Sequence, residues 1–573
     1  MAEGVKSGEK TALRRSFRGW CRQHAFALRL RFAQSRVGRR SFRAQRFLFM
    51  PPHLEVSDIS IAGDIAAGQI VLAGRSLLTG GLSPFDCPAP SRKFSEELQG
   101  FQWLVHFDTL ENARNRDAAR ARVGEFMARR EADPAFAILT PVVVAKRMFA
   151  WLTHCALLCE NGDIHHYKRL LAHLARDGAL LRLYAQRSGL GTGRLYAAIG
   201  LLYHALCLNG TSRAINQAED LLRAALDDAM TPDGGTRDRN AAHVADLAAH
   251  LIPLLALYRI RQANPPGFLN PALLRMVGFL CMMQHPDGGL ALFNGAGIAA
   301  RDRINAITQF SGGRVSRLDS APETGFERLE NQQAIVIADS GMHPPAAYAS
   351  QAGVSALAFE FSTRSNRVIV NCGTPPAAEG EVAALYRVSA AHSGIMMDGE
   401  GLGRLVPVVN GLGLPEMALV ANATGVAPQR KHTAAGEVLT LGHGGFLAAF
   451  GYMMERRLTL MQPEAGLLGL DRFMDVDGKG IPRRITLAFH LHPGVIPSRM
   501  PRPDCMMLRL PNQKPGRDLW LFEAPDCPLQ LDESRCFQQE SSQIKTTQIL
   551  LEREITGSID IAWRLTPYRG ERR

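Results

Sequence analysis

The sequence lacks any uninterrupted run of about eighteen apolar residues, the length that a helix needs to cross a bilayer. Its ten cysteines are scattered and form no CxxC pair. Cys155 and Cys159 stand four apart beside His154 in an apolar stretch, but the neighbouring sequence offers too few further ligands for a metal clip. We therefore expect core thiols, no metal site, no cofactor and no transmembrane segment.

Acidic residues are scarce at the N-terminus. Residues 1–50 hold eleven Arg and two Lys against Glu3 and Glu9, so nearly all of the net charge of +12 lies there. The rest of the chain is almost neutral, which removes the pI as an argument for nucleic-acid binding. This basic N-terminal arm, residues 1–50, is either an amphipathic helix on the protein's own surface, which we favour, or a contact for nucleic acid or an anionic membrane.

Part of the arm resembles an export signal but does not match one in full. Arg14, Arg15 and Phe17 resemble a twin-arginine signal, but further arginines interrupt what should be its apolar core. It is not recognisable as a signal peptide, so a cytoplasmic location stays open. The oligomeric state is equally open.

The length of 573 residues predicts at least two domains. Residues 47–75 alternate in the manner of short strands and residues 80–90 are rich in Gly and Pro, so we expect a short extended lead-in over residues 51–94. Over residues 95–312 apolar residues recur at intervals of three and four, which predicts amphipathic helices. Pro-Asp-Gly-Gly occurs at 232–235 and again at 286–289. This repeated turn indicates helical pairs in an arc or ring, either an (α/α) toroid or a solenoid.

Beyond residue 313 the helical period disappears. Many short β-type runs with turn signals between them predict an antiparallel β-sandwich over residues 313–573. The runs include residues 333–338, 356–361, 367–370, 438–441, 485–491 and 519–523.

Several segments, in their order along the chain, resemble the heparinase II/III family. They are residues 232–240 (PDGGTRDRN), 287–297 (DGGLALFNGAG), 357–361 (LAFEF), 368–373 (VIVNCG), 391–393 (AHS) and 489–495 (FHLHPGV). The resemblance covers roughly residues 95–570. It implies an (α/α) toroid joined to a β-sandwich, with a substrate cleft between them. It also implies a bacterial polysaccharide lyase acting on an acidic, uronate-containing glycan such as a glycosaminoglycan, in the cell envelope or periplasm.

The chemistry implied by the resemblance is β-elimination. The substrate carboxylate must be neutralised before the C5 proton becomes acidic enough to remove. A base then takes that proton, and an acid protonates the departing glycosidic oxygen. A working site must supply all three roles.

The chain departs from the family pattern at several of these positions. Where the family commonly reads Asp-Gly-Gly-His-x-Glu-Arg-Ser-Pro-x-Tyr-His, Thr236 stands at the first His, Asp238 at the Glu, Arg239 at the Arg, Asn240 at the Ser and His243 at the Tyr. An imidazole can replace the missing tyrosine as base. Residues 351–355 (QAGVS) replace a His-x-His-x-Asp pattern, which removes its metal ligands. Arg194 stands near the position of a missing Asn-His pair.

We accordingly predict a site made of two sets of residues. The catalytic set is His243, Arg239, Asn240 and His392; the substrate-binding set is Arg194, Arg237, Asp238, Tyr386 and Arg387. Arginine suits carboxylate neutralisation through its bidentate fork. The structural alternatives are a helix cap for Asn240, a surface ion pair for the cluster and a hydrogen-bonded structural role for His392. Two functions follow: a lyase with an altered or degenerate site, or a non-catalytic glycan-binding protein of the cell envelope.

Overall fold

The computed structural model describes the chain outside residues 1–24, 34, 36–41, 43–45, 109–112, 161–162, 298–300, 311–314, 376–377, 411, 413, 421–424, 464–465, 512–518, 526, 540–541 and 569–573. Most of the basic N-terminal arm therefore lies outside the described residues. Within it, residues 25–33 form a helix. Phe26 and Leu30 pack against the helical core while Leu28 and Phe32 are exposed, so this short helix lies on the protein's own surface.

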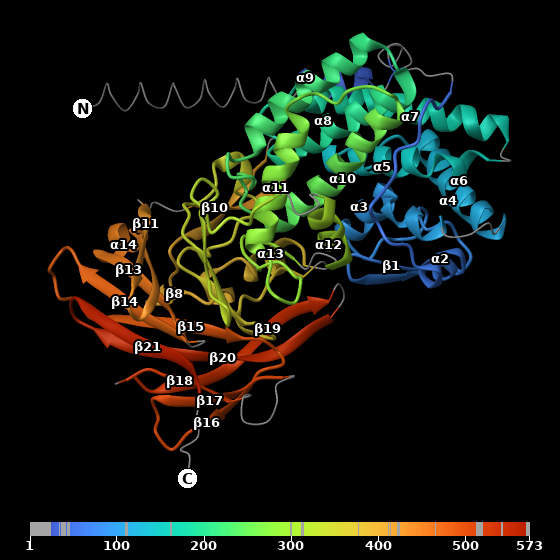
Figure 1. The fold of residues 1–573 in the computed structure, drawn as a ribbon. Helices are drawn as coiled ribbons and strands as arrows, with labels where there is room; N and C mark the ends of the chain where they lie inside the picture. The colour runs from blue at the N-terminus through green and yellow to red at the C-terminus, as the bar shows by residue number, and fades with distance from the viewer. Residues whose placement is uncertain are drawn as a thin grey trace, which may run out of the picture.

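The first half of the chain is helical, as predicted (Figure 1). Its elements are α2 (Ile59–Ala66), β1 (Gln69–Leu72), β2 (Arg75–Leu78), α3 (Arg92–Gly100), η2 (Gln102–Phe107), α4 (Ala113–Ala132), α5 (Pro141–Thr153), α6 (Cys155–Cys159), α7 (Ile164–Ala185), α8 (Thr192–His204), η3 (Ala205–Asn209), α9 (Ser212–Ala229), α10 (Ala241–Ile260), α11 (Leu269–Met283) and α12 (Arg301–Phe310). Successive long helices pack on one another, which forms the predicted arc.

The lead-in differs in part from the extended segment that we expected. Residues 47–58 have no helix or strand, but α2 follows where alternating strands were predicted. Asp58 caps α2 by accepting a hydrogen bond from the Ser60 backbone at 2.8 Å. Ala62 and Ile65 are buried three residues apart, which is helical spacing. The alternation was therefore misleading, because the buried face follows a period of three to four.

The repeated Pro-Asp-Gly-Gly forms the same turn twice. In the first copy Thr231 N donates to Gly235 O at 3.0 Å, and in the second His285 N donates to Gly289 O at 2.9 Å. Gly234 and Gly288 both have positive φ. A Cβ at Gly234 would lie 2.1 Å from Arg275 O, so only glycine fits there.

The second half of the chain is a pair of antiparallel sheets, again as predicted. One sheet has the order β19-β20-β15-β7-β6-β5-β4-β3, with β8 beside β15, and the other has β11-β12-β13-β14-β21-β18-β17-β16. Strand bounds are β3 (Ser320–Ala321), β4 (Phe326–Glu330), β5 (Ala334–Asp339), β6 (Phe359–Thr363), β7 (Arg367–Val370), β8 (Ile395–Met397), β9 (Arg404–Val409), β10 (Pro415–Val420), β11 (Gly425–Thr433), β12 (Gly436–His443), β13 (Tyr452–Met461), β14 (Leu467–Asp475), β15 (Arg483–Leu491), β16 (Ile496–Arg499), β17 (Cys505–Arg509), β18 (Leu519–Glu523), β19 (Leu529–Gln539), β20 (Ser542–Ile555) and β21 (Ile559–Pro567). Short elements between them are η4 (Ala346–Tyr348), α13 (Gly380–Leu385), η5 (Ser389–Ala391) and α14 (Leu447–Phe450), and β9 pairs only with β10 among the described strands.

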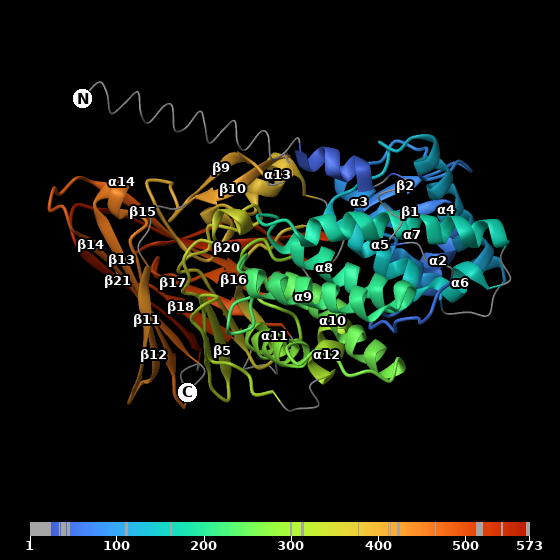
Figure 2. The ribbon, with the colours of Figure 1, turned by 90° about the horizontal axis from the view of Figure 1, so that it is seen from above.

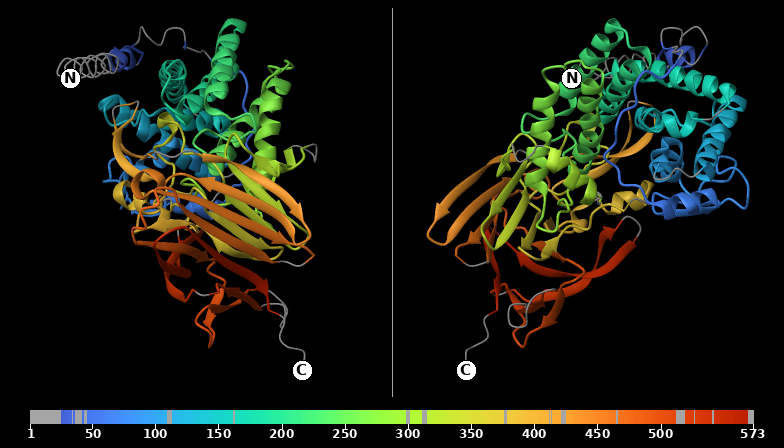
Figure 3. Two further views of the ribbon diagram at one scale, coloured as in Figure 1. Left: turned by 90° about the vertical axis from the view of Figure 1, so that its left-hand side faces the viewer. Right: turned by 45° about the vertical axis from the view of Figure 1, so that its right-hand side comes forward.

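Strand β5 shows how the sheets meet the helices. All six of its residues are buried. Ile335 and Ile337 belong to the core of the helical part. The alternate residues Ala334, Val336 and Ala338 belong to the core between the sheets. Side chains alternate across a strand, so one face of this sheet supports the helices and the other packs on the second sheet. The helices consequently lie on one side of the sheets (Figures 2 and 3).

Helix α10 is long and apolar enough to cross a membrane by length and composition, with a hydropathy of 1.4. However, 78% of its most apolar window is buried inside the protein. A helix that is apolar on all sides is expected in the core of a large domain. We interpret α10 as the central core helix.

A buried charge cluster holds three helices together. Asp177 on α7 is fully buried and bonds Arg130 of α4 at 2.8 Å and Arg147 of α5 at 2.7 Å. We predict that Asp177→Asn lowers the free energy of unfolding by about 3–5 kcal/mol, because it leaves buried arginine charge uncompensated. Denaturant unfolding followed by far-UV circular dichroism measures this loss. The control Asp220→Asn, on the exposed side of α9, should change stability by less than about 0.5 kcal/mol; equal losses would refute the cluster's role.

Candidate functional site

The candidate site begins at the turn that leads into α10. Asn240 caps the helix: its side-chain oxygen accepts from the backbone of Ala242 at 2.9 Å and of His243 at 3.4 Å. The residue is buried, and its amide donates to Asn294 O at 3.3 Å. Asn240 therefore has the geometry of a helix cap, which was the structural alternative, and its polar atoms bond within the protein.

Asp238 and His243 form a hydrogen-bonded dyad. The His243 Nδ1 atom lies 2.7 Å from Asp238 Oδ2, and the His243 side chain is 24% exposed. Burial lowers the pKa of His243, but the charge and hydrogen bond of Asp238 outweigh it and hold the pKa above its ordinary value. Asp238 also accepts from Thr236 and from the Asn240 backbone, which fixes its carboxylate. Because Asp238 bonds Nδ1, the neutral ring carries its proton on Nδ1 and its lone pair on Nε2.

The side chain of Arg239 bonds to the sandwich domain. Its guanidinium donates to Thr324 O at 2.7 Å, Gly325 O at 2.9 Å and Met342 O at 3.0 Å, and it forms an ion pair with Asp339. The side chain is 7% exposed, and its φ of 61° is left-handed. These internal acceptors use the donors that a substrate carboxylate would need, so the geometry assigns Arg239 to joining the two halves.

The other two predicted arginines of the helical part meet at Asp228. Arg194 bonds the Asp228 carboxylate at 3.0 Å and Arg237 bonds the Asp228 carbonyl at 2.9 Å. The hydroxyl of Tyr348, on η4, donates to the same carbonyl at 2.8 Å. Gly191 approaches this element so closely that a Cβ would lie 2.6 Å from Ala347 O. The structure thus brings Arg194, Arg237 and Tyr348 together where helices meet the sandwich.

Behind His243 lies a second carboxylate, Asp246, one helical turn along α10. It accepts a hydrogen bond from Tyr196 and pairs with Arg303 at 3.1 Å and Lys146 at 3.4 Å. Burial raises the pKa of Asp246, but these cations outweigh burial and hold it well below its ordinary value. Burial raises the pKa of Tyr196, so its hydroxyl stays protonated.

The predicted residues of the sandwich lie apart from the dyad. His392 is buried, its Nδ1 lies 2.9 Å from Val388 O, and burial lowers its pKa. Arg387 donates to Ala352 O at 2.9 Å and to two further backbone carbonyls, and burial lowers its pKa to about 10. Tyr386 packs its ring on Phe537. Within the part of the chain that the structure describes, none of these three hydrogen-bonds to the dyad. Arg387 holds the loop before β6.

Sequence reasoning missed several residues of this region: Asp228, Asp246, Tyr196, Lys146, Arg303 and Tyr348. Asp246 could have been found from the sequence, since it follows His243 by three positions on a predicted helix and so lies on the same face. Tyr348 carried none, because its partners are over a hundred residues away in sequence.

Comparison with known proteins agrees with this architecture. Residues 313–564 match the family model "Heparinase II/III-like, C-terminal". Heparinase III has a TM-score of 0.68 at 10% identity, over 96% of this chain and 90% of that chain. Heparan sulfate lyase HepC from Pedobacter heparinus has a TM-score of 0.57 at 12% identity, over 96% and 88%. FtsZ-localized protein C of Caulobacter vibrioides (strain NA1000 / CB15N) is 26% identical over 525 residues, 88% of this chain and 89% of that protein.

The fold is therefore the helical toroid plus antiparallel β-sandwich of the heparinase-type lyases. Within it, residues 313–564 are a heparinase II/III-like C-terminal domain, and the resemblance expected from the motifs is confirmed.

We predict that Arg239→Met destabilises the protein by about 3–5 kcal/mol, because fully buried Asp339 loses its cation. His243→Asn is the matched control: its amide can still donate to Asp238, so stability should stay within about 0.5 kcal/mol of wild type. Denaturant unfolding of both variants measures the difference. An Arg239→Met protein as stable as wild type would show that Arg239 does not hold the helical part to the sandwich.

Proposed function

We propose that this protein is a polysaccharide lyase that acts on a uronate-containing glycan by β-elimination, with histidine in place of the family's tyrosine base. The observation that carries the proposal is the His243–Asp238 dyad, with an aligned 2.7 Å contact and a partly exposed ring. It stands at the junction of helices and sandwich, where the motif resemblance puts the substrate.

His243 would take the C5 proton. The Asp238 carboxylate accepts Nδ1–H, so Nε2 carries the lone pair that attacks the proton. Asp238 then stabilises the imidazolium that forms. A base of this kind contributes about 10²–10⁴ in rate.

Arg237 would neutralise the substrate carboxylate. It is the exposed cation of the group around Asp228, whereas Arg194 is already paired with the carboxylate there. Among the described residues the Asp228 carbonyl accepts only the Nε–H of Arg237, which leaves the two terminal nitrogens of the guanidinium for a carboxylate.

Tyr348 would protonate the departing glycosidic oxygen. Burial raises its pKa, so the hydroxyl stays protonated and suits the role of acid rather than base. Asp238 is an electrostatic neighbour of both Tyr348 and His243, which links the two groups.

A second candidate is a glycan-binding protein of the cell envelope without turnover. It is favoured by Arg239 and Arg387, whose guanidinium groups are taken up by internal carbonyls. A relative named for its localisation with FtsZ, rather than for a lyase reaction, also favours it.

The deciding experiment incubates the protein with heparan, hyaluronan, alginate and bacterial acidic exopolysaccharides, and follows the ultraviolet absorbance of the unsaturated uronate product. We expect a rise that falls by about 10²–10⁴ in His243→Ala while glycan affinity is kept. Arg237→Ala should raise KM and weaken binding. If wild type binds a glycan, loses that binding in Arg237→Ala and yet yields no unsaturated product, the binding function replaces the lyase; no binding to any glycan refutes both.

The pH profile tests the dyad. Since Asp238 holds the pKa of His243 above its ordinary value, kcat/KM should rise through a pH above about 6.5, as the ring loses its proton. Asp238→Asn keeps an acceptor for Nδ1–H but removes the charge, so the rising limb should move to lower pH. An unmoved limb would mean that another group is the base.

A further inference from the structure

Residues 47–58, which include the start of the lead-in, run along the helical part from η3 to η2. Leu48 N donates to Cys207 O at 2.7 Å at one end, and Asp58 N donates to the His106 ring at 3.1 Å at the other. Between them the Glu55 carboxylate pairs with Arg303 at 2.7 Å. A segment without helix or strand is thus held to the helices by a backbone hydrogen bond at one end and by side-chain contacts along the rest.

Where this segment passes the end of η2, three metal-ligating side chains converge. His53 comes from the lead-in, Asp108 directly follows η2, and His154 caps the end of α5. Asp108 Oδ2 lies 3.0 Å from His154 Nδ1 and 3.5 Å from His53 Nε2. All three ligand atoms lie within 4.8 Å of one another.

These separations match the edges of a metal tetrahedron. An ion with bonds of about 2.0–2.1 Å to nitrogen and oxygen holds its ligand atoms about 3.3–3.4 Å apart. The two separations to Asp108, 3.0 and 3.5 Å, bracket that length. The third separation, between the ligand nitrogens of the two histidines, is at most 4.8 Å, so the histidines need to approach each other by no more than about 1.4 Å to share one ion.

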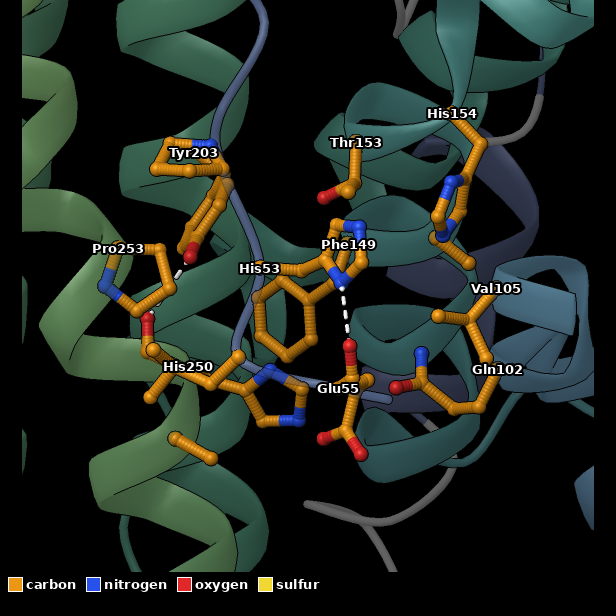
Figure 4. A pocket seen from close by; sticks show the side chains of 14 residues that line it. His53, Glu55, Gln102, Val105, Phe149, Thr153, His154, Tyr203, His250 and Pro253 are labelled. Atoms are coloured by element: carbon orange, nitrogen blue, oxygen red, sulfur yellow. Dashed lines mark hydrogen bonds between the residues drawn. The ribbon is translucent and has the colours of Figure 1, made fainter. Parts of the chain in front are cut away.

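The hydrogen bond on the far side of His53 fixes which nitrogen faces the cluster. Its Nδ1 lies 3.1 Å from the Glu55 carbonyl, which can only accept, so Nδ1 carries the proton (Figure 4). In the neutral ring the Nε2 lone pair then points at the Asp108 carboxylate, and two acceptors face each other. A cation between them, either a proton on His53 or a metal ion, resolves this conflict. A ligating histidine whose other nitrogen bonds a backbone carbonyl is the usual arrangement around protein-bound metals.

The cluster also has room for a further ligand. His53 and His154 line a small cavity together with Thr153, Gln102 and His250 (Figure 4). Three protein ligands with a fourth position open to water are typical of zinc sites that are not closed by protein. The nitrogen and oxygen donor set favours zinc over calcium or magnesium, which prefer oxygen alone.

The cysteines next to His154 do not compete well for such an ion. Cys155 is buried and Cys159 is half-buried, and neither belongs to the group of ligand atoms that lie within 4.8 Å of one another.

We propose that His53, Asp108 and His154 bind one divalent transition-metal ion of the zinc class, which fastens residues 47–58 to the helical part. The argument for this site does not rest on the proposed lyase reaction, and its ligands lie on other elements than the His243–Asp238 dyad. Its ligands come from three separate segments, so the ion cross-links them.

The experiment uses the full chain, stripped with a chelator and titrated with zinc by calorimetry, and with cobalt by visible spectroscopy. We expect about one ion per chain, and a tetrahedral or five-coordinate cobalt spectrum without sulfur charge-transfer bands. His53→Ala and Asp108→Asn, both on partly exposed side chains, should weaken binding by more than about 100-fold. His165→Ala, on the exposed start of α7, is the matched control and should bind as wild type does.

A second readout tests the fastening itself. Zinc should slow amide hydrogen exchange over residues 47–58 in wild type and in His165→Ala, but not in His53→Ala. Three results would overturn the proposal: no zinc binding by the stripped protein, equal affinity in all variants, or sulfur bands that place cobalt on Cys155 and Cys159. Loss of the lyase reaction alone would not affect it, since binding is measured without substrate.

Discussion

The buried ion pair between Arg239 and Asp339 is the constraint on which the candidate site depends. Arg239 adopts a left-handed backbone conformation that is unfavourable for a residue with a side chain, and the carbonyls of Thr324 and Gly325 help to hold it there. The turn thereby sends Arg239 into the sandwich and Asn240 into its capping position at α10. His243 follows one turn later, so the direction of its ring is set by a contact that never touches substrate.

The two Pro-Asp-Gly-Gly turns also bond the helical part to the sandwich. In the first, Asp233 accepts from the backbone of Glu323 and Thr324 at 2.9 Å each. In the second, Asp287 receives a bidentate pair from Arg367 of β7 at 2.9 and 3.0 Å. The cationic partner outweighs burial and holds the pKa of Asp287 at about 2, so this contact persists at all but strongly acidic pH. The sequence repeat therefore marks the two points at which helical hairpins dock on the sheet.

Much of this architecture could be predicted because it rests on local patterns. Strands β7 and β18 begin and end at the predicted residues, and the cap and dyad at 238–243 lie within one short segment. The lead-in misled the prediction because Ile59 and Ile61 alternate while the buried face of α2 has helical spacing. Tyr348 and His53 could not be placed from sequence, because their partners come from remote segments whose approach depends on tertiary packing.

The lead-in gives the two sites a physical connection. His53 precedes by two residues Glu55, whose carboxylate holds Arg303. The same guanidinium pairs with Asp246, which shares a face of α10 with His243. Whatever fixes His53 therefore also limits where Glu55 sits, and with it how Arg303 divides its charge between Glu55 and Asp246. Since Asp246 contributes to raising the pKa of His243, the charge balance at the dyad depends on a segment that precedes every helix of the arc.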